Sequence, residues 1–146
     1  MILVDANILI YAYDKRSPQH INARTWLSNV LVGHDTVAFS WIVMMAFIRT
    51  ATNKKLFLKP YSTNEAFDVV KNWLSAPRSS IISPGREHLS ITRQLAHEGG
   101  VYGADLTDAH IAALAIEHGA SLATTDGDFQ KFSGLRLINP LVQIEK

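Results

Sequence analysis

The sequence predicts an α/β fold: a mostly parallel central sheet of about four to five strands flanked by helices, in a single domain over residues 1–146. Short apolar runs rich in branched residues alternate with helical patterns, which is typical of a parallel sheet covered on both faces. The 146 residues suit one domain with one core. Hydrophobic residues make up 47% and charged residues 18%, as in a globular protein rather than a disordered one.

The expected strands are all short. The opening run ILVD reads as a buried strand that ends on Asp5. Four further strands are expected at residues 36–40, 80–83, 121–125 and 135–139. Ligands bind beyond the carboxyl ends of strands in such sheets, so Asp5 and Asp126 are predicted at the same edge.

Helix ends are predicted from capping residues. Ser17–Pro18 and Ser83–Pro84 each combine an N-cap with a proline at the first helical position. The three tryptophans recur among aliphatic residues at helical spacing, so we expect all of them in the core. The other expected helix starts are Ser40, Thr63 and Thr107, and the expected stops are Gly33, Gly99–Gly100 and Gly119.

Composition excludes several classes of protein. The absence of Cys removes disulfides, thiolate zinc sites and cysteine nucleophiles, and it is compatible with a reducing compartment. No apolar run approaches the roughly 18–20 residues that span a bilayer. The start MILVDANILIYAYD lacks the basic region of a secretory signal. We therefore expect a cytoplasmic protein with no membrane partner.

The charge is unevenly distributed along the chain. The net charge of +1 argues against a protein that coats nucleic acid by bulk electrostatics. Between Thr36 and Asn64 there is no acid, while Arg49, Lys54, Lys55 and Lys59 fall together. This segment is either a solvated surface or a track for a phosphate backbone.

Five acids in the chain point to a metal site. Asp5 ends an apolar strand, Asp105 and Asp108 lie at the start of an apolar helix, and Asp126 and Asp128 follow the strand at 121–125. Carboxylates brought together repel unless a divalent cation compensates them. Oxygen-only ligation favours a hard ion such as Mg²⁺ or Mn²⁺, and such sites support phosphodiester hydrolysis.

Taken singly, these acids have simpler explanations. Asp108 can serve as a helix-dipole partner, and Asp126 and Asp128 can form a turn. His110 and His118 read as a surface residue and a partner of the helix C-terminus rather than as ligands. No Gly-rich phosphate loop, GxSxG elbow or HxxxH pair is present.

Three segments together resemble the PIN-domain ribonucleases. These are MILVDANILIYAYD, DAHIAALAIEHGA and LATTDGDFQKFSGLRLINP. More narrowly, they are similar to the toxin half of VapBC-type toxin–antitoxin pairs. The resemblance covers almost the whole chain and is weakest across residues 60–100.

The resemblance implies an Mg²⁺- or Mn²⁺-dependent endoribonuclease that forms a homodimer and is inhibited by a small cognate antitoxin protein. Asp5, Asp108 and Asp126 fall on the family's metal-binding acids, which are also its catalytic residues. Asp128 falls on an accessory ligand position, and Asn7 and Thr125 fall on polar positions that orient the acids. The RNA substrate would be held, in this interpretation, by the basic group Arg49, Lys54 and Lys55.

One position departs from the family pattern. Ala46 stands where the family usually has Glu in the helix after the second strand. Asp105 or Asp128 substitutes for that Glu, the enzyme uses one metal, or its activity is low; the sequence leaves all three open. A binding module without catalysis on the same fold is therefore the main alternative. A dehalogenase-like phosphatase is disfavoured because Asn7 stands where its second Asp is needed, and a receiver domain lacks its paired acid and partner Lys.

Overall fold

Residues 1–142 are described by the computed structural model, and the last four residues of the predicted domain, 143–146, lie outside them. Five parallel strands form one sheet in the order β3-β2-β1-β4-β5. The α/β fold with a parallel sheet is therefore confirmed. The strands are β1 (Ile2–Val4), β2 (Val37–Phe39), β3 (Ser79–Ile81), β4 (Ser121–Ala123) and β5 (Leu137–Ile138).

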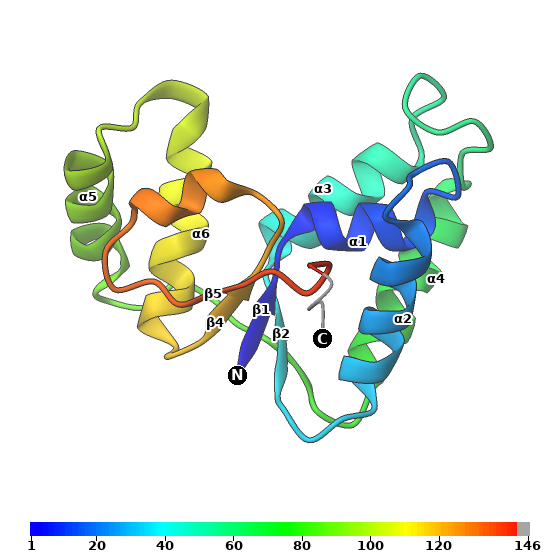
Figure 1. Ribbon diagram of the computed structural model, residues 1–146, viewed down its shortest axis with the longest axis horizontal. Coiled ribbons are helices and arrows are strands. Elements are labelled where there is room, and N and C mark those ends of the chain that lie inside the picture. Colours follow the sequence, from blue (N-terminus) through cyan, green and yellow to red (C-terminus); the bar gives the residue numbers. More distant parts are fainter. Residues whose placement is uncertain (143–146) are drawn as a thin grey trace.

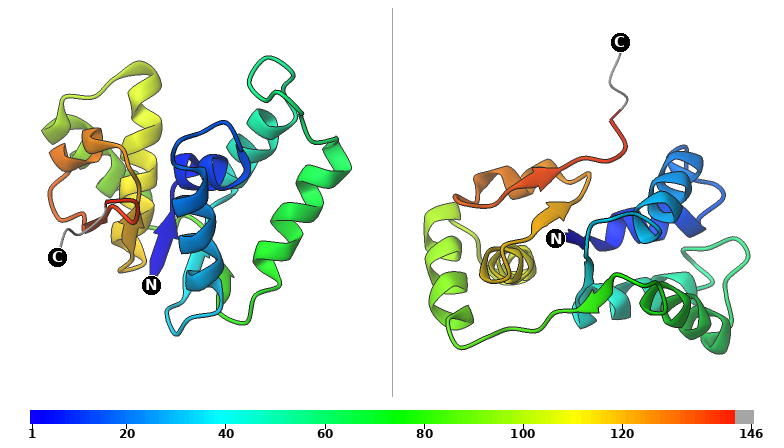
Figure 2. Two further views of the ribbon diagram at one scale, coloured as in Figure 1. Left: turned by 45° about the vertical axis from the view of Figure 1, so that its right-hand side comes forward. Right: turned by 90° about the horizontal axis from the view of Figure 1, so that it is seen from below.

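Helices cover both faces of this sheet, as the alternating pattern predicted. In Figures 1 and 2 one face carries α5 and α6, and the other carries the first four helices. The helices are α1 (Ala6–Tyr13), α2 (His20–Leu31), α3 (Trp41–Ala51), α4 (Thr63–Leu74), α5 (His88–Gly99) and α6 (Leu106–Glu117). One 3₁₀ turn, η1 (Gly103–Asp105), precedes α6, and another, η2 (Gly127–Lys131), follows β4.

Burial on both faces explains why apolar and polar residues do not alternate along the central strands. Leu3 and Val4 of β1 and all three residues of β2 are fully buried, because helices pack on both faces. Trp73 is also fully buried and stacks on Phe39 with ring centroids 5.7 Å apart. Trp26 packs against the core, but Trp41 is 54% exposed, so its predicted place in the core is wrong.

Helix ends that depend on local side-chain chemistry lie at or next to the positions predicted from the sequence. The Ser40 hydroxyl accepts a hydrogen bond from the Val43 N–H at 3.4 Å and caps α3. Gly119 follows α6 with a φ of 65°, a left-handed conformation that glycine adopts without steric cost. At α4 the cap is Ser62, one residue before the predicted start, in a reciprocal capping box with Glu65.

Three other predicted helix starts are wrong. Ser17 does not cap a helix: its hydroxyl accepts from the Gln19 N–H, and α2 begins at His20. After Ser83–Pro84 the chain continues to His88 before α5 begins. Thr107 lies inside α6, whose N-cap is Asp105.

Helix α1 was not predicted from the sequence. It begins immediately after β1, and Asp5 is its N-cap. The run from Ile2 to Tyr13 is apolar almost throughout, so it shows neither a period of two nor a clear period of 3.6. Within residues 1–142, no helix is long and apolar enough to cross a membrane.

Candidate active site

Asp5 is held at the carboxyl edge of the sheet by the pairing of β1 with β4. Val4 of β1 pairs with Ala123 of β4, so the residues that follow these two strands, Asp5 and Thr124, lie side by side. The Asp5 N–H donates to the Ala123 carbonyl at 2.9 Å, which continues the ladder one step beyond β1. Its side chain then accepts from the Ala6 N–H at 2.8 Å and caps α1.

The Thr124 hydroxyl connects the polar groups of this edge. It donates to Asp5 Oδ2 at 2.7 Å, and it accepts from Asn7 Nδ2 at 3.2 Å and from the Asp126 N–H at 3.1 Å. The sequence assigned the orienting role to Thr125, but the hydroxyl that contacts these groups belongs to its neighbour. Asn7 was expected to orient the acids, and it lies in this network.

Asp126 and Asp128 lie in the turn that follows β4. Asp126 is the N-cap of η2, and its Oδ1 accepts from the Asp128 N–H at 2.9 Å. The simpler interpretation, that these acids form a turn, therefore describes the backbone correctly. The turn also brings the Asp126 charge close enough to raise the pKa of both Asp5 and Asp108.

The electrostatics of Asp5 reflect its burial. Only 8% of the residue is exposed, and this desolvation raises the pKa of its carboxyl above the usual value of 3.8. The hydrogen bonds from Thr124 and Ala6 act in the opposite direction, and the charge of Asp126 adds to the increase.

Asp108 approaches the same edge from the first turn of α6. Partial burial is the largest cause of its raised pKa, followed by the negative charges of Asp126, Asp5 and Asp105. The carboxylates of three other acids, from three parts of the chain, thus act on Asp108. Lys131, on η2, lowers the pKa of Asp108. Sequence analysis missed this lysine, although it follows Asp126 by five residues in the same short segment.

The donor set at this edge fits a hard divalent cation. As the side chains stand, no three His, Asp or Glu residues within 1–142 form a group that could hold a metal ion. The Asn7 Oδ1, however, is buried and has no hydrogen-bond partner in this part of the chain. The Thr124 hydroxyl proton goes to Asp5, so the amide must present Nδ2 to Thr124 and leave this oxygen available. An unpaired buried acceptor beside mutually repelling carboxylates is the environment that a cation stabilises.

The basic residues predicted to bind RNA lie at the end of α3 and in the turn after it. Arg49 is exposed in the last turn of α3, and Lys54 and Lys55 are exposed in the turn that follows. None of them is among the causes of the raised pKa of Asp5 or Asp108. Ala46 is half-buried on α3 and is not part of the buried core.

A second polar cluster connects α5 to α6. His88 Nδ1 lies 2.6 Å from Glu117 Oε2, and His88 Nε2 lies 2.8 Å from His110 Nδ1. The other oxygen of Glu117 accepts from the Gly85 N–H at 3.0 Å. His110 is thus a half-buried hydrogen-bonding residue and not the surface residue that was predicted. His118 is the C-cap of α6, and its Nε2 lies 2.8 Å from the Ser83 carbonyl oxygen.

Comparison with known families matches residues 2–135 to the PIN domain. The chain is 42% identical over 142 residues to Ribonuclease VapC37 of Mycobacterium tuberculosis, covering 96% of this chain and 97% of the relative. It is 33% identical over 141 residues to Ribonuclease VapC33 of the same species, covering 97% and 99% of the two chains.

Solved structures share the fold at lower identity. The FitAB complex bound to the IR36 DNA fragment contains a chain that matches with a TM-score of 0.70 and 22% identity, covering 99% of both chains. A chain of VapBC2 from Rickettsia felis, bound to a promoter DNA fragment, matches with a TM-score of 0.66 and 24% identity, covering 94% and 98%.

Proposed function

Because the chain belongs to the PIN-domain family, we propose that it is a metal-dependent endoribonuclease and the toxin of a type II toxin–antitoxin pair. The relatives at 33% and 42% identity, both named as VapC ribonucleases, support the activity. The observation that carries the proposal is that Asp5, Asp108 and Asp126 lie on three different segments and meet at one sheet edge, where burial and the charge of Asp126 raise the pKa of both Asp5 and Asp108.

Each residue of the site has a distinct task in this proposal. Asp5, Asp108 and Asp126 hold Mg²⁺ or Mn²⁺, with Asn7 Oδ1 as a further oxygen donor and Asp105 and Asp128 as accessory acids. The bound ion supplies activation of a water molecule and stabilisation of the leaving oxygen. Thr124 fixes the Asp5 carboxylate through its 2.7 Å hydrogen bond. Lys131 contributes positive charge near Asp108.

The activity is tested by mapping cleavage of total cellular RNA after pulse expression of wild type and of Asp5→Asn. Wild type should produce discrete new 5′ ends that the variant lacks, and chelation by EDTA should abolish them in purified protein. Identical RNA profiles for the two proteins would favour the alternative, a binding module without catalysis, for which Ala46 in place of the usual Glu is the supporting feature.

The partners follow from the same proposal. Structures of VapBC and FitAB complexes share the fold, which supports a cognate antitoxin as the protein partner. A homodimer is supported by an exposed apolar stripe on α3, where Trp41 is 54%, Ile42 40% and Met45 47% exposed. Light scattering should give the mass of a dimer, and Met45→Glu should shift it toward a monomer.

A further inference from the structure

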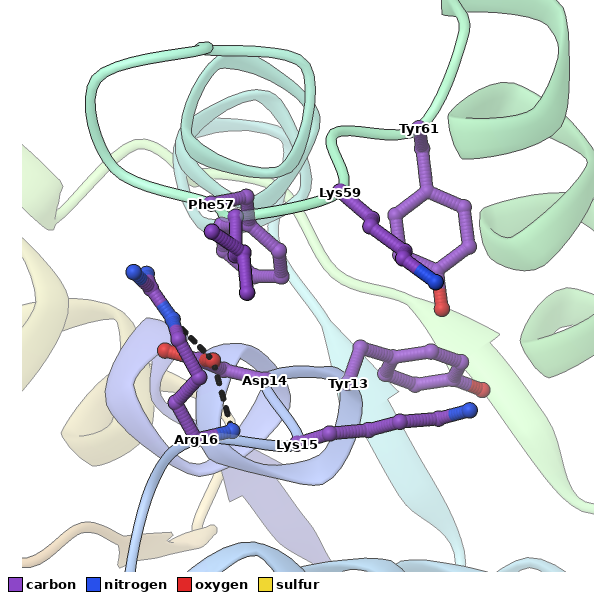
Figure 3. A pocket seen from close by; sticks show the side chains of 8 residues that line it. Tyr13, Asp14, Lys15, Arg16, Phe57, Lys59 and Tyr61 are labelled. Atoms are coloured by element: carbon purple, nitrogen blue, oxygen red, sulfur yellow. Dashed lines mark hydrogen bonds and ion pairs between the residues drawn. The ribbon is translucent and has the colours of Figure 1, made fainter.

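A cavity of about 370 Å³ lies at the end of α1 opposite to Asp5. One wall is the end of α1 with the turn that follows it, and the other is the loop between α3 and α4 (Figure 3). The eight residues of α1, at about 1.5 Å each, place the cavity roughly 12 Å from Asp5. It is therefore distinct from the carboxylate edge but within reach of a chain bound there.

The aromatic residues of the cavity are held in place before any ligand binds. Tyr13 is fixed by a hydrogen bond to its hydroxyl from Trp73 Nε1 at 3.0 Å. Phe57 is 5% exposed and forms a floor. Tyr61 is half-buried, with its ring centroid 6.2 Å from Tyr13 and 6.4 Å from Phe57. The Arg24 guanidinium lies 4.3 Å from the Tyr13 ring centroid, so the half-buried Tyr61 ring, backed by Tyr13 and Phe57, is the surface that a flat apolar group would contact.

The cations of the cavity divide into one structural residue and two available ones. The Arg16 Nε bonds to Asp14 Oδ1 at 3.4 Å, and its guanidinium also donates to the Leu56 carbonyl, so it fastens the two walls together. Lys15 and Lys59 are exposed, extend past the Tyr13 and Tyr61 rings in Figure 3, and have no ion-pair partner within residues 1–142. Two ammonium groups therefore flank the aromatic rings from opposite walls.

We propose that this cavity is a nucleotide subsite for the RNA substrate, with a base against the aromatic rings and a phosphate between Lys15 and Lys59. Aromatic rings combined with a basic surface are the usual means of holding single-stranded nucleic acid. The subsite rests on the proposed ribonuclease function, because the same strand would extend to the carboxylates. At roughly 3.4 Å per stacked nucleotide, the 12 Å separation corresponds to about three to four nucleotides.

The binding test uses Asp5→Asn protein in EDTA, so that RNA stays intact, and fluorescence anisotropy with a labelled single-stranded RNA of mixed sequence. Lys15→Gln combined with Lys59→Gln should weaken binding about 10-fold. It should also reduce the slope of log affinity against log salt by about 0.7, because the protein no longer neutralises the one phosphate held between the two lysines. Lys71→Gln combined with Arg78→Gln removes the same charge outside the cavity and should weaken binding less than about 3-fold.

A second variant separates the contribution of the Tyr61 ring to RNA binding from that of the two ammonium groups. Tyr61→Leu should weaken binding about 10-fold and leave the salt slope unchanged, because it removes a stacking surface and keeps both ammonium groups. In the cleavage-competent protein, the two lysine changes should raise KM and leave kcat unchanged, since the cavity contributes to binding rather than chemistry. Shortening the RNA until it no longer reaches the cavity should remove the difference between wild type and variant.

The outcomes distinguish this subsite from the proposed activity. Wild type that binds RNA through Lys15 and Lys59 but cleaves none would refute the ribonuclease and leave the subsite standing. Cleavage with the same KM in the lysine variant and its charge-matched control would overturn the subsite alone. Unchanged RNA affinity, together with lysine-dependent binding of an acidic peptide that contains an aromatic residue, would make the cavity a protein-docking site and the proposal wrong.

Discussion

Helix α6 contributes to two polar clusters that are built on opposite principles. At its first turn, the pKa of Asp108 is raised by partial burial and then by the like charges of Asp126, Asp5 and Asp105. At its last turn, Glu117 has both oxygens occupied, one by the Gly85 N–H and one by His88. In the first cluster, carboxylates of like charge repel one another. In the second, the Glu117 carboxylate and the His88 ring have hydrogen-bond partners.

This difference indicates what each cluster is for. A buried polar network whose donors and acceptors pair with one another stabilises the fold and needs no ligand. A group of carboxylates that destabilise one another's charged forms is retained for another reason, such as a cation. The clusters should therefore respond to mutation with opposite signs.

The largest expected effect is on catalysis at the carboxylate edge. Asp108→Asn should reduce RNA cleavage at least about 100-fold, because it removes a metal ligand. Even the loss of a residue that only orients a ligand typically reduces activity about 10–100-fold. Its melting temperature in EDTA should equal or exceed that of wild type, because repulsion with Asp5 and Asp126 is relieved. Mg²⁺ should stabilise wild type more than the variant.

Asp68→Asn is the matched control, since it makes the same change at an exposed position on α4. It should alter neither cleavage nor the response to Mg²⁺. A large loss of stability in Asp108→Asn would instead identify Asp108 as a structural residue and contradict the metal site.

The second cluster should show the opposite response. Glu117→Ala leaves the Gly85 N–H and His88 without their acceptor, which should lower the free energy of unfolding by about 1–3 kcal/mol. Glu117→Gln should cost less, because the amide oxygen still accepts from Gly85 and a tautomer change lets His88 accept from the amide. Urea unfolding measures both, with Glu87→Ala as the control, since this exposed glutamate before α5 makes no capping hydrogen bond. A Glu117→Ala protein as stable as wild type would show that the network does not hold α5 to α6.

The pH dependence of stability provides a further test of the repulsion. Burial and neighbouring charges raise the pKa of Asp108, so the folded protein binds this proton at a higher pH than the unfolded chain does. Its charge therefore destabilises the fold near neutral pH, and this penalty declines as pH falls through the raised pKa toward 3.8. The stability advantage of Asp108→Asn in EDTA should be largest near pH 7 and should shrink toward pH 4. An advantage that grows as the pH falls would contradict the assigned cause.

The two clusters also differ in how far the sequence predicted them. Asp5 and Asp126 could be placed together because parallel strands end at one edge, and the effect of the Asp126 charge on the pKa of Asp5 agrees with that placement. The orienting hydroxyl was assigned to Thr125 on family resemblance, whereas strand register sets Thr124 beside Asp5. Neighbouring residues in extended chain point to opposite sides, so a shift of one position changes the partner completely.

The His88 cluster has no local signature. His88 is separated by 22 residues from His110 and by 29 from Glu117, so no spacing along one helix shows that they meet. The same limit affected helix starts: Ser40 contacts an amide three residues away, whereas Ser17 and Ser83 carry a cap-like sequence without the helix directly after it. Contacts within one turn were predictable, and contacts between α5 and α6 required the packed structure.

The smallest expected effect concerns Ala46 and the strength of the cation site. Ala46 is half-buried and lies outside the core, so a glutamate there should leave the fold intact, whereas a fully buried unpaired charge would cost several kcal/mol. If α3 presents this position to the carboxylate edge, Ala46→Glu adds the acid that the family usually has and should tighten Mn²⁺ binding about 10-fold. Cleavage should rise with it, because a second metal position stabilises the leaving oxygen. Mn²⁺ titration and thermal melting of the variant measure both effects, with Asn64→Glu on the first turn of α4 as a control for added charge. Unfolding, or Mn²⁺ affinity equal to that of the control, would place position 46 away from the site and leave the acids that follow β1 and β4 and those at the start of α6 as its complete acidic set.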